Sequence, residues 1–449
     1  MSNTLMNHSQ THFLSGNEAV AHAVRLCRPA VIAAYPITPQ TVVVERLAEM
    51  VEEGELAAEF VHVESEHSAL SLVMGSAAMG VRTFTATSSQ GLLYMAECLP
   101  YTAGGRFPLV MMNANRALAL PWNIYGDQSD SLSQLSCGWI QAYAETAQES
   151  LDLTIQAYAL AENPQVRTPV LINLDGFVLT HTYEPVVLPT QEQVDGFLPS
   201  PLFADGTPGT FSLSQPQNLA ITAGPGEYTQ FKYLQHQAMR HSLTTIATLS
   251  QRFNAHFGRG EEGIREGVIE AYRLDDAERV IITLGSVAGT VRTVVDRLRA
   301  KGEAVGLLRL RYLRPFPQET LLNALFGSHR SRNVRAIAVL EKDISFGQQG
   351  SVALEVKSAL FDYASQSGKL LPQLINQIAG LGGQEISLEH IEGLFAALSQ
   401  RRSEHFAEPD LRFLGIDTVN PTVANPSPSI TVTAPEVSHI HEVSHENID

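Results

Sequence analysis

The sequence predicts an α/β protein made of two consecutive units, each with a largely parallel sheet. Short apolar runs such as 30–34 and 170–174 show no polar alternation, which is typical of strands covered on both faces. Segments with apolar residues at helical spacing separate these runs. A proline-rich stretch at 185–216 interrupts the alternation, which resumes near residue 278. Strands that alternate with helices predict right-handed βαβ crossovers in both units.

The first unit contains most of the predicted elements. Helices are expected to begin at 16–24 and to cover 41–53, 68–80 and 92–98, and strands are expected at 30–34, 60–63, 83–87, 109–113 and 170–174. The prolines of 185–216 predict a loop that wraps the surface. Residues 217–275 combine a short strand at 220–222 with long polar helices.

The second unit is expected to start near residue 278. Its predicted strands are 279–284, 305–310 and 336–340, and a helix is predicted at 290–301. The last stretch, 417–449, holds four prolines and no lysine or arginine, so it cannot bury enough apolar surface to fold. Its three histidines lack neighbours that would orient metal ligands. We expect a flexible N-terminus at 1–11, domains at 12–250 and 251–415, and a disordered acidic tail at 416–449.

Composition excludes several classes of function. The net charge of −17 at pH 7 argues against nucleic-acid or anionic-membrane partners, because both need a basic face. No apolar run reaches the roughly 18–20 residues that span a bilayer, and the N-terminus lacks signal-peptide features, so a cytoplasmic protein is expected. Cys27, Cys98 and Cys137 form no Cys-x-x-Cys pair. Any iron–sulfur cluster would therefore lie on another chain.

Three strand ends in the first hundred residues carry polar side chains. Residues 35–39 (Tyr-Pro-Ile-Thr-Pro) close a strand, and their prolines display Thr38 on a rigid turn. Residues 63–69 and 85–95 also lead from strands into helices. The carboxyl ends of parallel strands share one edge of the sheet, where open α/β sheets place their ligands. We therefore expect these three junctions to meet.

The residues alone leave the role of each polar side chain open. Glu66 or Glu64 could be a buried proton-exchanging carboxylate, or could cap the following helix. Thr38 could contact a ligand or only shape the turn. Arg116 could bind an anion or form a surface ion pair, and the small apolar residues around it favour the anion. The turn 88–91 could approach a ligand or only start a helix.

Taken in order, these blocks and several later ones resemble the α subunit of 2-oxoacid:ferredoxin oxidoreductases, closest to the pyruvate type. The resemblance covers roughly residues 12–415, and its specificity comes from the order of the blocks rather than from any single one. It implies a thiamine diphosphate-binding fold of the pyrimidine-domain type, followed by a transketolase C-terminal-like α/β domain. The later blocks are 115–118, 123–130, 174–185, 284–290, 311–317 and 343–350.

The resemblance implies a role for each candidate residue. Glu66 corresponds to the carboxylate that hydrogen-bonds N1′ of the thiamine diphosphate aminopyrimidine and so promotes removal of the thiazolium C2 proton. Ser89 and Gln90 correspond to the turn beside the aminopyrimidine. Arg116 is expected to bind the 2-oxoacid carboxylate through its planar guanidinium. The Thr38 hydroxyl is expected to hydrogen-bond the same carboxylate or the keto oxygen.

One half of the cofactor site is missing from the sequence. Thiamine diphosphate enzymes hold Mg²⁺ and the diphosphate with a Gly-Asp-Gly and a later asparagine, and the Leu-Asp-Gly at 174–176 lacks the first glycine. We therefore expect no metal site on this chain and a partner β subunit that supplies the Mg²⁺ and diphosphate half. Asp127 and Asp130 have no further ligands nearby in sequence, and we interpret them as loop and interface residues.

The resemblance implies an enzyme subunit that decarboxylates pyruvate or a related 2-oxoacid oxidatively. Coenzyme A would accept the acyl group, and electrons would pass through γ and iron–sulfur δ subunits to a ferredoxin-type acceptor. One alternative is a paralogue for a branched-chain or aryl 2-oxoacid, such as phenylglyoxylate, that passes electrons to NAD through further subunits. An alternative of a different class is a non-catalytic scaffold that docks a redox partner. The sequence does not identify the 2-oxoacid, the final acceptor or the direction of flux.

Overall fold

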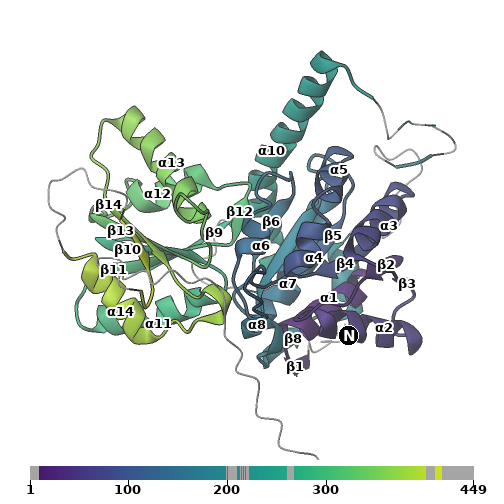
Figure 1. The fold of residues 1–449 in the computed structure, drawn as a ribbon, viewed down its shortest axis with the longest axis horizontal. Helices are drawn as coiled ribbons and strands as arrows, with labels where there is room; N and C mark the ends of the chain where they lie inside the picture. Colours follow the sequence, from purple (N-terminus) through teal and green to yellow (C-terminus); the bar gives the residue numbers. More distant parts are fainter. Residues whose placement is uncertain are drawn as a thin grey trace, which may run out of the picture. The chain divides into compact units, whose positions relative to one another are not determined.

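A parallel sheet with one antiparallel edge forms the centre of the first α/β unit (Figure 1). The computed structural model describes residues 10–198, 200, 210–212, 214, 216, 218, 222–259, 267–400 and 410–416. Within these residues the first sheet has seven strands, in the spatial order β12 (Tyr312–Arg314), β6 (Ile140–Tyr143), β7 (Val170–Asp175), β5 (Val110–Asn115), β4 (Thr83–Thr87), β2 (Val31–Ala34) and β3 (Glu59–His62). Only β12 runs antiparallel to its neighbour.

Helices cover both faces of the first sheet, as its apolar strands predict. Successive strand residues point to opposite faces, so Ile32 and Val110 enter one core while Ala33 and Met111 enter another. The first core lies under α1 (Gly16–Cys27), α2 (Thr41–Glu52) and α7 (Ala147–Ala161), and the second lies under α3 (Glu66–Ala78), α4 (Ser89–Tyr94) and α5 (Cys98–Gly104).

The strand order of the first sheet contains a topological switch point. From β2 the chain crosses to β3 on one side, whereas from β4 it crosses to β5 on the other side. Strands β2 and β4 are neighbours in the sheet, with Val31 opposite Thr83. Open α/β sheets place their ligands at such a switch point, outside the carboxyl ends of the strands. The turns that follow β2 and β4 lie at this point.

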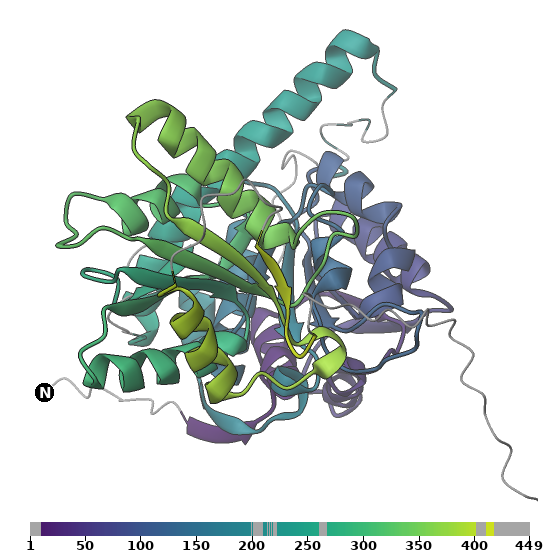
Figure 2. The same ribbon diagram turned by 60° about the vertical axis from the view of Figure 1, so that its left-hand side comes forward.

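A second sheet of six strands follows within the described part of the chain. Its order is β15 (Leu411–Phe413), β14 (Gln373–Ile378), β13 (Ala336–Glu341), β10 (Arg279–Leu284), β11 (Val305–Leu310) and β9 (Ile269–Tyr272). Helices α11 (Val287–Ala300) and α14 (Leu388–Ala397) pack on one face, and α12 (Gln318–Phe326) and α13 (Ser351–Ser367) pack on the other. Figure 2 shows this sheet, in green and yellow, between the two helix layers.

The two sheets are joined by chain and by core. Strand β12 follows β11 of the second sheet but pairs with β6 of the first, where Tyr312 lies opposite Ala142. The largest apolar core is continuous across both sheets and includes Val110 and Ile282. The short helices α6 (Ser129–Leu132) and α8 (Val178–His181) and the turn η1 (Leu381–Gly383) occupy the connections.

Two expectations about local structure were wrong. Residues 185–216 are not simply a loop, because β8 (Glu184–Leu188) pairs with β1 (Gln10–Leu14) and α9 (Gln191–Phe197) follows. The signal for α9 is a capping box in which Thr190 and Gln193 bond each other's backbone N–H.

The predicted helix 92–98 is also divided. Helix α4 ends at Tyr94 and α5 begins at Cys98. Pro100 has no N–H to donate to a preceding carbonyl, so it is tolerated in the first turn of a helix but breaks a continuous one.

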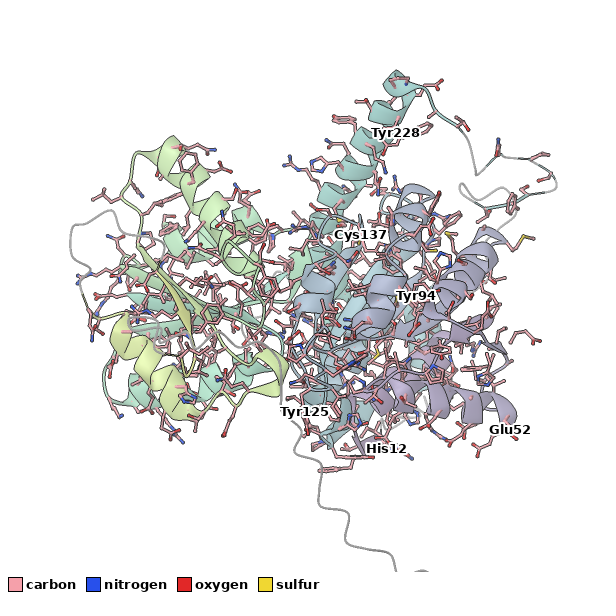
Figure 3. All side chains as sticks on the ribbon, in the orientation of Figure 1. His12, Glu52, Tyr94, Tyr125, Cys137 and Tyr228 are labelled. Atoms are coloured by element: carbon pink, nitrogen blue, oxygen red, sulfur yellow. The ribbon has the colours of Figure 1, made fainter. Side chains whose placement is uncertain are left out.

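Some predicted regions fall partly outside the described residues. The strand expected at 220–222 and the tail at 416–449 do so almost entirely. Strand β1 begins inside the predicted extension 1–11, and α10 (Pro225–Phe257) spans the predicted boundary at 250, which stays a prediction. Residues 225–234 of α10 are exposed, among them Tyr228 (Figure 3). Within the described residues, none of the helices has the length and hydropathy needed to cross a bilayer.

Candidate active site

The turn after β2 displays Thr38 at the switch point. Buried Gln40 holds this turn, because its Nε2 donates to the carbonyl of Tyr35 at 3.0 Å and to that of Ala86 on β4 at 3.2 Å. Asn17 of α1 donates to the carbonyl of Pro39 at 2.9 Å. The Thr38 side chain is exposed. The two strands of the switch point are thus bridged by one amide, and Thr38 stands beside that bridge.

Glu66 is the first residue of α3, and the helix is capped by a neighbour. Ser65 accepts a hydrogen bond from the backbone N–H of Ser68 at 3.1 Å, and exposed Glu64 accepts one from the Ser68 hydroxyl at 2.7 Å. Glu66 takes no part in this cap, although it is only 7% exposed. Its carboxylate has no hydrogen-bond partner in the described chain. Of the two acids, only Glu66 is buried with its acceptors free.

Helix α4 approaches Glu66 closely, and a glycine permits this. A Cβ built on Gly91 would lie 2.7 Å from Oε1 of Glu66 and 2.5 Å from Oγ1 of Thr87. Any larger residue would therefore push α4 away from the carboxylate. The Thr87 hydroxyl is buried and has no hydrogen-bond partner within the described residues. The Glu66 carboxylate and the buried Thr87 hydroxyl thus both lie beside the start of α4.

Ser89 begins α4 in a left-handed backbone conformation. Its φ is 51°, which costs a non-glycine residue on the order of 1 kcal/mol or more. Its hydroxyl lies 2.6 Å from the carbonyl of Ala117, the residue after Arg116, and 2.6 Å from Oε1 of half-buried Gln90. The expected turn therefore exists and contacts the loop that carries Arg116.

Arg116 follows β5 and is a buried cation without a carboxylate partner. It is 6% exposed, and its Nη1 donates to the backbone carbonyl of Thr38 at 2.7 Å. Nε is buried and has no partner, and no acidic side chain of the described chain forms an ion pair with it. Burial lowers the pKa of the Arg116 guanidinium below its ordinary value, and the Asp130 carboxylate partly opposes this. A guanidinium in this state is suited to an anionic ligand.

Asp130 connects the ends of β4 and β5. It is fully buried, and its Oδ2 accepts from the backbone N–H groups of Ser89 at 3.0 Å and of Arg116 at 3.2 Å. The expectation that Asp130 is a loop or interface residue was therefore wrong. Asp127 does lie at a contact between loop and turn, where burial raises the pKa of its carboxyl to about 7 with help from Asp130.

Asp175 bonds residues of the second unit and, within the described chain, none of the candidate site residues. At the carboxyl end of β7 it pairs with buried Lys342 at 3.0 Å and accepts from the backbone N–H of Ser286 at 2.8 Å. Burial opposes ionisation, but Lys342 holds the pKa of Asp175 below its ordinary value. The described residues contain no group of three or more His, Cys, Asp or Glu placed to hold a metal ion. The carboxylate at 174–176 thus joins the two sheets.

The structure brings most of the predicted site together. Thr38 contacts Arg116, Ser89 contacts the residue after Arg116, and Glu66 lies against the start of α4. Within the described residues, no hydrogen bond or ion pair joins Glu66 to Arg116, so the carboxylate and the cation are separate binding groups. Sequence reasoning missed Gln40 and misread Asp130. Their roles depend on β2, β4 and β5 being neighbours, so the sole local signal was a polar residue after a strand.

Comparison with known proteins identifies two family models that match this chain. The family described as pyruvate flavodoxin/ferredoxin oxidoreductase, thiamine diphosphate-binding, matches residues 22–249, and core domain II of pyruvate:ferredoxin oxidoreductase matches residues 277–391. The second match falls in the unit for which the transketolase C-terminal-like fold is expected. The expected thiamine diphosphate-binding α/β fold is confirmed.

The match with the curated relatives spans nearly the whole length of each relative. Pyruvate synthase subunit PorA of Methanothermobacter thermautotrophicus is 42% identical over 403 residues, which is 90% of this chain and 97% of that one. Ketoisovalerate oxidoreductase subunit VorA of Pyrococcus abyssi is 40% identical over 383 residues, 85% of this chain and 91% of that one. The structure of 2-oxoglutarate:ferredoxin oxidoreductase from Magnetococcus marinus shares the fold with a TM-score of 0.62 at 20% identity, covering 87% of this chain and 66% of that one. The chain therefore belongs to the pyruvate flavodoxin/ferredoxin oxidoreductase family.

Proposed function

We propose that this chain is the α-type subunit of a 2-oxoacid oxidoreductase and that it binds the aminopyrimidine half of thiamine diphosphate together with the 2-oxoacid. The observation that carries the proposal is a pair of buried charged groups at the switch point that have no partner of opposite charge. Within the described chain Arg116 forms no ion pair and its Nε has no hydrogen-bond partner, and Glu66 forms no ion pair. Burying such groups is costly unless a ligand completes them.

The residues at the switch point fit the aminopyrimidine. The buried acceptors that lack partners in the described chain include Oε1 of Gln40 and Oγ1 of Thr87. An aminopyrimidine offers N–H donors and a ring nitrogen that exchanges a proton with a carboxylate. Glu66 would hold that proton, and Ser89 and Gln90 would line the same side through the turn at the start of α4. When bound, thiamine diphosphate supplies the nucleophilic carbon that adds to a 2-oxoacid carbonyl.

Arg116 and Thr38 would position the substrate. The Arg116 fork is free for a carboxylate except for the bond from Nη1 to Thr38. That bond ties the guanidinium to the turn on which the exposed Thr38 hydroxyl stands. The carboxylate and the keto oxygen of one 2-oxoacid would thus meet both groups at once. Arg116 is the only lysine or arginine in residues 111–127, so no neighbour in that loop could replace it.

The reaction follows from the family. A 2-oxoacid, coenzyme A and an oxidised acceptor would give acyl-CoA, CO₂ and the reduced acceptor, with pyruvate as the first candidate and ferredoxin as acceptor. The relative named for ketoisovalerate is nearly as similar as the pyruvate synthase subunit, so a branched-chain substrate is the second candidate. A β subunit would supply Mg²⁺ and diphosphate binding, and γ and δ subunits would carry electrons, in the cytoplasm. In a scaffold, the buried unpaired charges would have no use.

Calorimetry and an activity assay test this proposal together. The lone chain should show no tight Mg²⁺-dependent binding of thiamine diphosphate, and binding should appear when the β subunit is added. The complete complex should release CO₂ from pyruvate faster than from 2-oxoisovalerate or phenylglyoxylate. Micromolar Mg²⁺-dependent binding to the lone chain would show that the site is not shared. A complex that releases CO₂ from none of the three acids would refute the proposed reaction.

A further inference from the structure

Asp130 is a buried acid that no basic side chain neutralises. It is fully buried in α6, and no lysine, arginine or histidine of the described chain forms an ion pair with it. Five N–H groups of the described residues surround its two oxygens instead. Oδ1 accepts from the Asn115 side chain and the Ser131 backbone, each at 2.7 Å. Oδ2 accepts from the Ser89 and Arg116 backbones at 3.0 and 3.2 Å and from the Asn113 side chain at 3.1 Å.

The hydrogen bonds show which form of the carboxyl group is needed. Every neighbour donates, so each oxygen acts as an acceptor, which is the behaviour of an ionised carboxylate. Burial raises the pKa of Asp130, and the bonds from Asn115 and Asn113 work against this rise. Asn113 and Asn115 lie two residues apart on β5 and therefore on the same face of the strand. Two residues on one face of β5 thus both donate hydrogen bonds to Asp130.

The single atom Oδ2 joins the two loops of the candidate active site. Ser89 starts the turn that follows β4, and Arg116 starts the loop that follows β5. Ser89 has its left-handed φ of 51°, a conformation that persists only when surrounding groups enforce it. Asp130, which accepts from the Ser89 N–H, is one such group, and the Ala117 carbonyl, which accepts from the Ser89 hydroxyl, is another. Asp130 therefore helps to set the separation of the two loops, together with the bond from Ser89 to Ala117.

We infer that Asp130 is a positioning residue that fixes Arg116 relative to the turn bearing Ser89, so that the 2-oxoacid and the cofactor are held at a defined distance. The inference rests on the proposed function for what the two loops bind. Asp130 contacts neither ligand itself, because backbone groups of Ser89 and Arg116 lie between. Its effect is on the geometry with which Arg116 meets the substrate carboxylate.

The variant Asp130→Asn tests this with little change of shape. One carboxylate oxygen becomes an NH₂ group that faces N–H donors, so the contacts of that atom change from hydrogen bonds to repulsion. We expect the KM for the 2-oxoacid to rise roughly tenfold, the scale of one lost hydrogen bond to a charged group, with a smaller change in kcat. Asp127→Asn is the matched control, since Asp127 is a buried acid three residues before Asp130 that accepts from the Ser129 backbone instead. It should leave KM within about twofold.

Kinetics on the assembled complex and amide exchange on the lone chain give separate answers. A raised KM in Asp130→Asn but not in Asp127→Asn supports the inference, whereas equal KM values in the two variants overturn it. If the wild-type complex releases no CO₂, the proposed function fails. The positioning role of Asp130 is then tested by amide hydrogen exchange alone. In the exchange experiment, the backbone amides of Ser89 and Arg116 should exchange faster in Asp130→Asn but not in Asp127→Asn. Unchanged protection of these two amides in Asp130→Asn would overturn the inference. If Asp130→Asn does not fold, Asn115→Ala, which removes one donor, should show the same changes in weaker form.

Discussion

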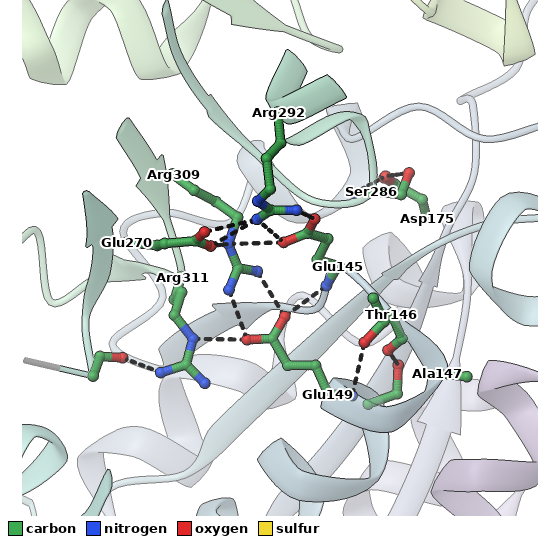
Figure 4. Close-up of polar contacts among 12 residues, drawn as sticks. Glu145, Thr146, Ala147, Glu149, Asp175, Glu270, Ser286, Arg292, Arg309 and Arg311 are labelled. Atoms are coloured by element: carbon green, nitrogen blue, oxygen red, sulfur yellow. Dashed lines mark hydrogen bonds and ion pairs between the residues drawn. The ribbon is translucent and has the colours of Figure 1, made fainter. Parts of the chain in front are cut away.

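Two regions of this molecule bury charged side chains, and they do so in opposite ways. Where the two sheets meet, three arginines and three glutamates form a cluster in which every charge has opposite partners (Figure 4). Glu149 of α7 bonds Arg309 at 2.6 Å and Arg311 at 2.7 Å. At the switch point, Arg116, Glu66 and Asp130 are also buried, but none of them has an ion-pair partner among the described residues. The remaining cluster members are Glu145, Glu270 and Arg292.

The difference separates structural charges from charges kept for ligands. Burying an ion is tolerated when a partner and hydrogen bonds replace water. The cluster meets this condition within the chain, where it ties α7 and the loop before it to β9, β11 and α11. The switch point meets this condition only in part. Asp130 accepts hydrogen bonds from five N–H groups, whereas Arg116 and Glu66 lack part of the hydrogen-bond partners that would replace water. Loss of a charge should therefore harm folding in the first region and ligand binding in the second.

The largest effect is expected from Glu149→Gln. It leaves Arg309 and Arg311 each short of a carboxylate, which typically costs about 3–5 kcal/mol of unfolding free energy for a buried pair. Urea unfolding at pH 7 measures this loss. Glu49→Gln, which removes an exposed partner of Arg46, is the control and should cost less than about 1 kcal/mol. Equal unfolding midpoints for the two variants would show that the cluster is not structural.

The same cluster predicts the direction of acid destabilisation. Burial disfavours ionisation of Glu149, but Arg309 and Arg311 outweigh burial and hold its pKa well below the ordinary value. A carboxyl group with a depressed pKa stabilises the fold above its unfolded pKa, and this contribution is lost as the pH falls below it. Unfolding free energy should therefore fall below about pH 4.5, and less steeply in Glu149→Gln than in the wild type.

Glu66→Gln should act on catalysis without loss of stability or assembly. The amide keeps the shape but cannot exchange the proton, so turnover of the assembled complex should fall roughly 100-fold or more. Glu64→Gln is the matched control two residues away, and it should be nearly neutral because Glu64 is exposed and bonds only Ser68. If Glu64→Gln were the damaging change, the assignment would be off by two residues.

Arg116→Ala should weaken substrate binding. Removing one partner of a bidentate pair in a water-poor site costs about 2–5 kcal/mol, or about 30-fold or more in kcat/KM. The KM for the 2-oxoacid should rise while thiamine diphosphate affinity is unchanged, as steady-state kinetics and calorimetry would show. Arg116→Lys should recover only part of the loss, since a point charge does not reproduce the fork. Weakened cofactor binding at constant KM would place Arg116 against the cofactor instead.

The smallest effect is a pH dependence at Asp127. Its pKa is raised from 3.8 to about 7, mainly by burial, so the folded chain binds a proton that the unfolded chain releases. Stability is then lost as the pH rises toward and through 7, by about 1.4 kcal/mol between pH 6 and pH 8. Asp127→Asn should remove this slope in urea unfolding. An identical slope in the variant would assign it to another group.

The sequence revealed what depends on neighbours along the chain. Strand ends at Thr38, Glu66 and Arg116 could be placed because apolar runs and prolines mark where buried strands stop. Contacts between distant segments left no local mark. Strand β12 lies far along the chain from β6, and the roles of Asp130 and Gln40 depend on which strands are neighbours. The capping box before α9 was a local signal, but the surrounding prolines concealed it.

The most direct test compares Arg116→Met with Arg309→Met by urea unfolding of the purified chain. Both variants replace a buried guanidinium with an apolar side chain of similar length. Arg309→Met should lose about 3 kcal/mol or more, because it removes one ion-pair partner from each of Glu145, Glu149 and Glu270 at once. Arg116→Met should stay within about 1 kcal/mol of the wild type, since its loss leaves only the carbonyl of Thr38 without a donor. Equal losses in the two variants would contradict the account, because Arg116 would then be a structural charge and not one kept for a ligand.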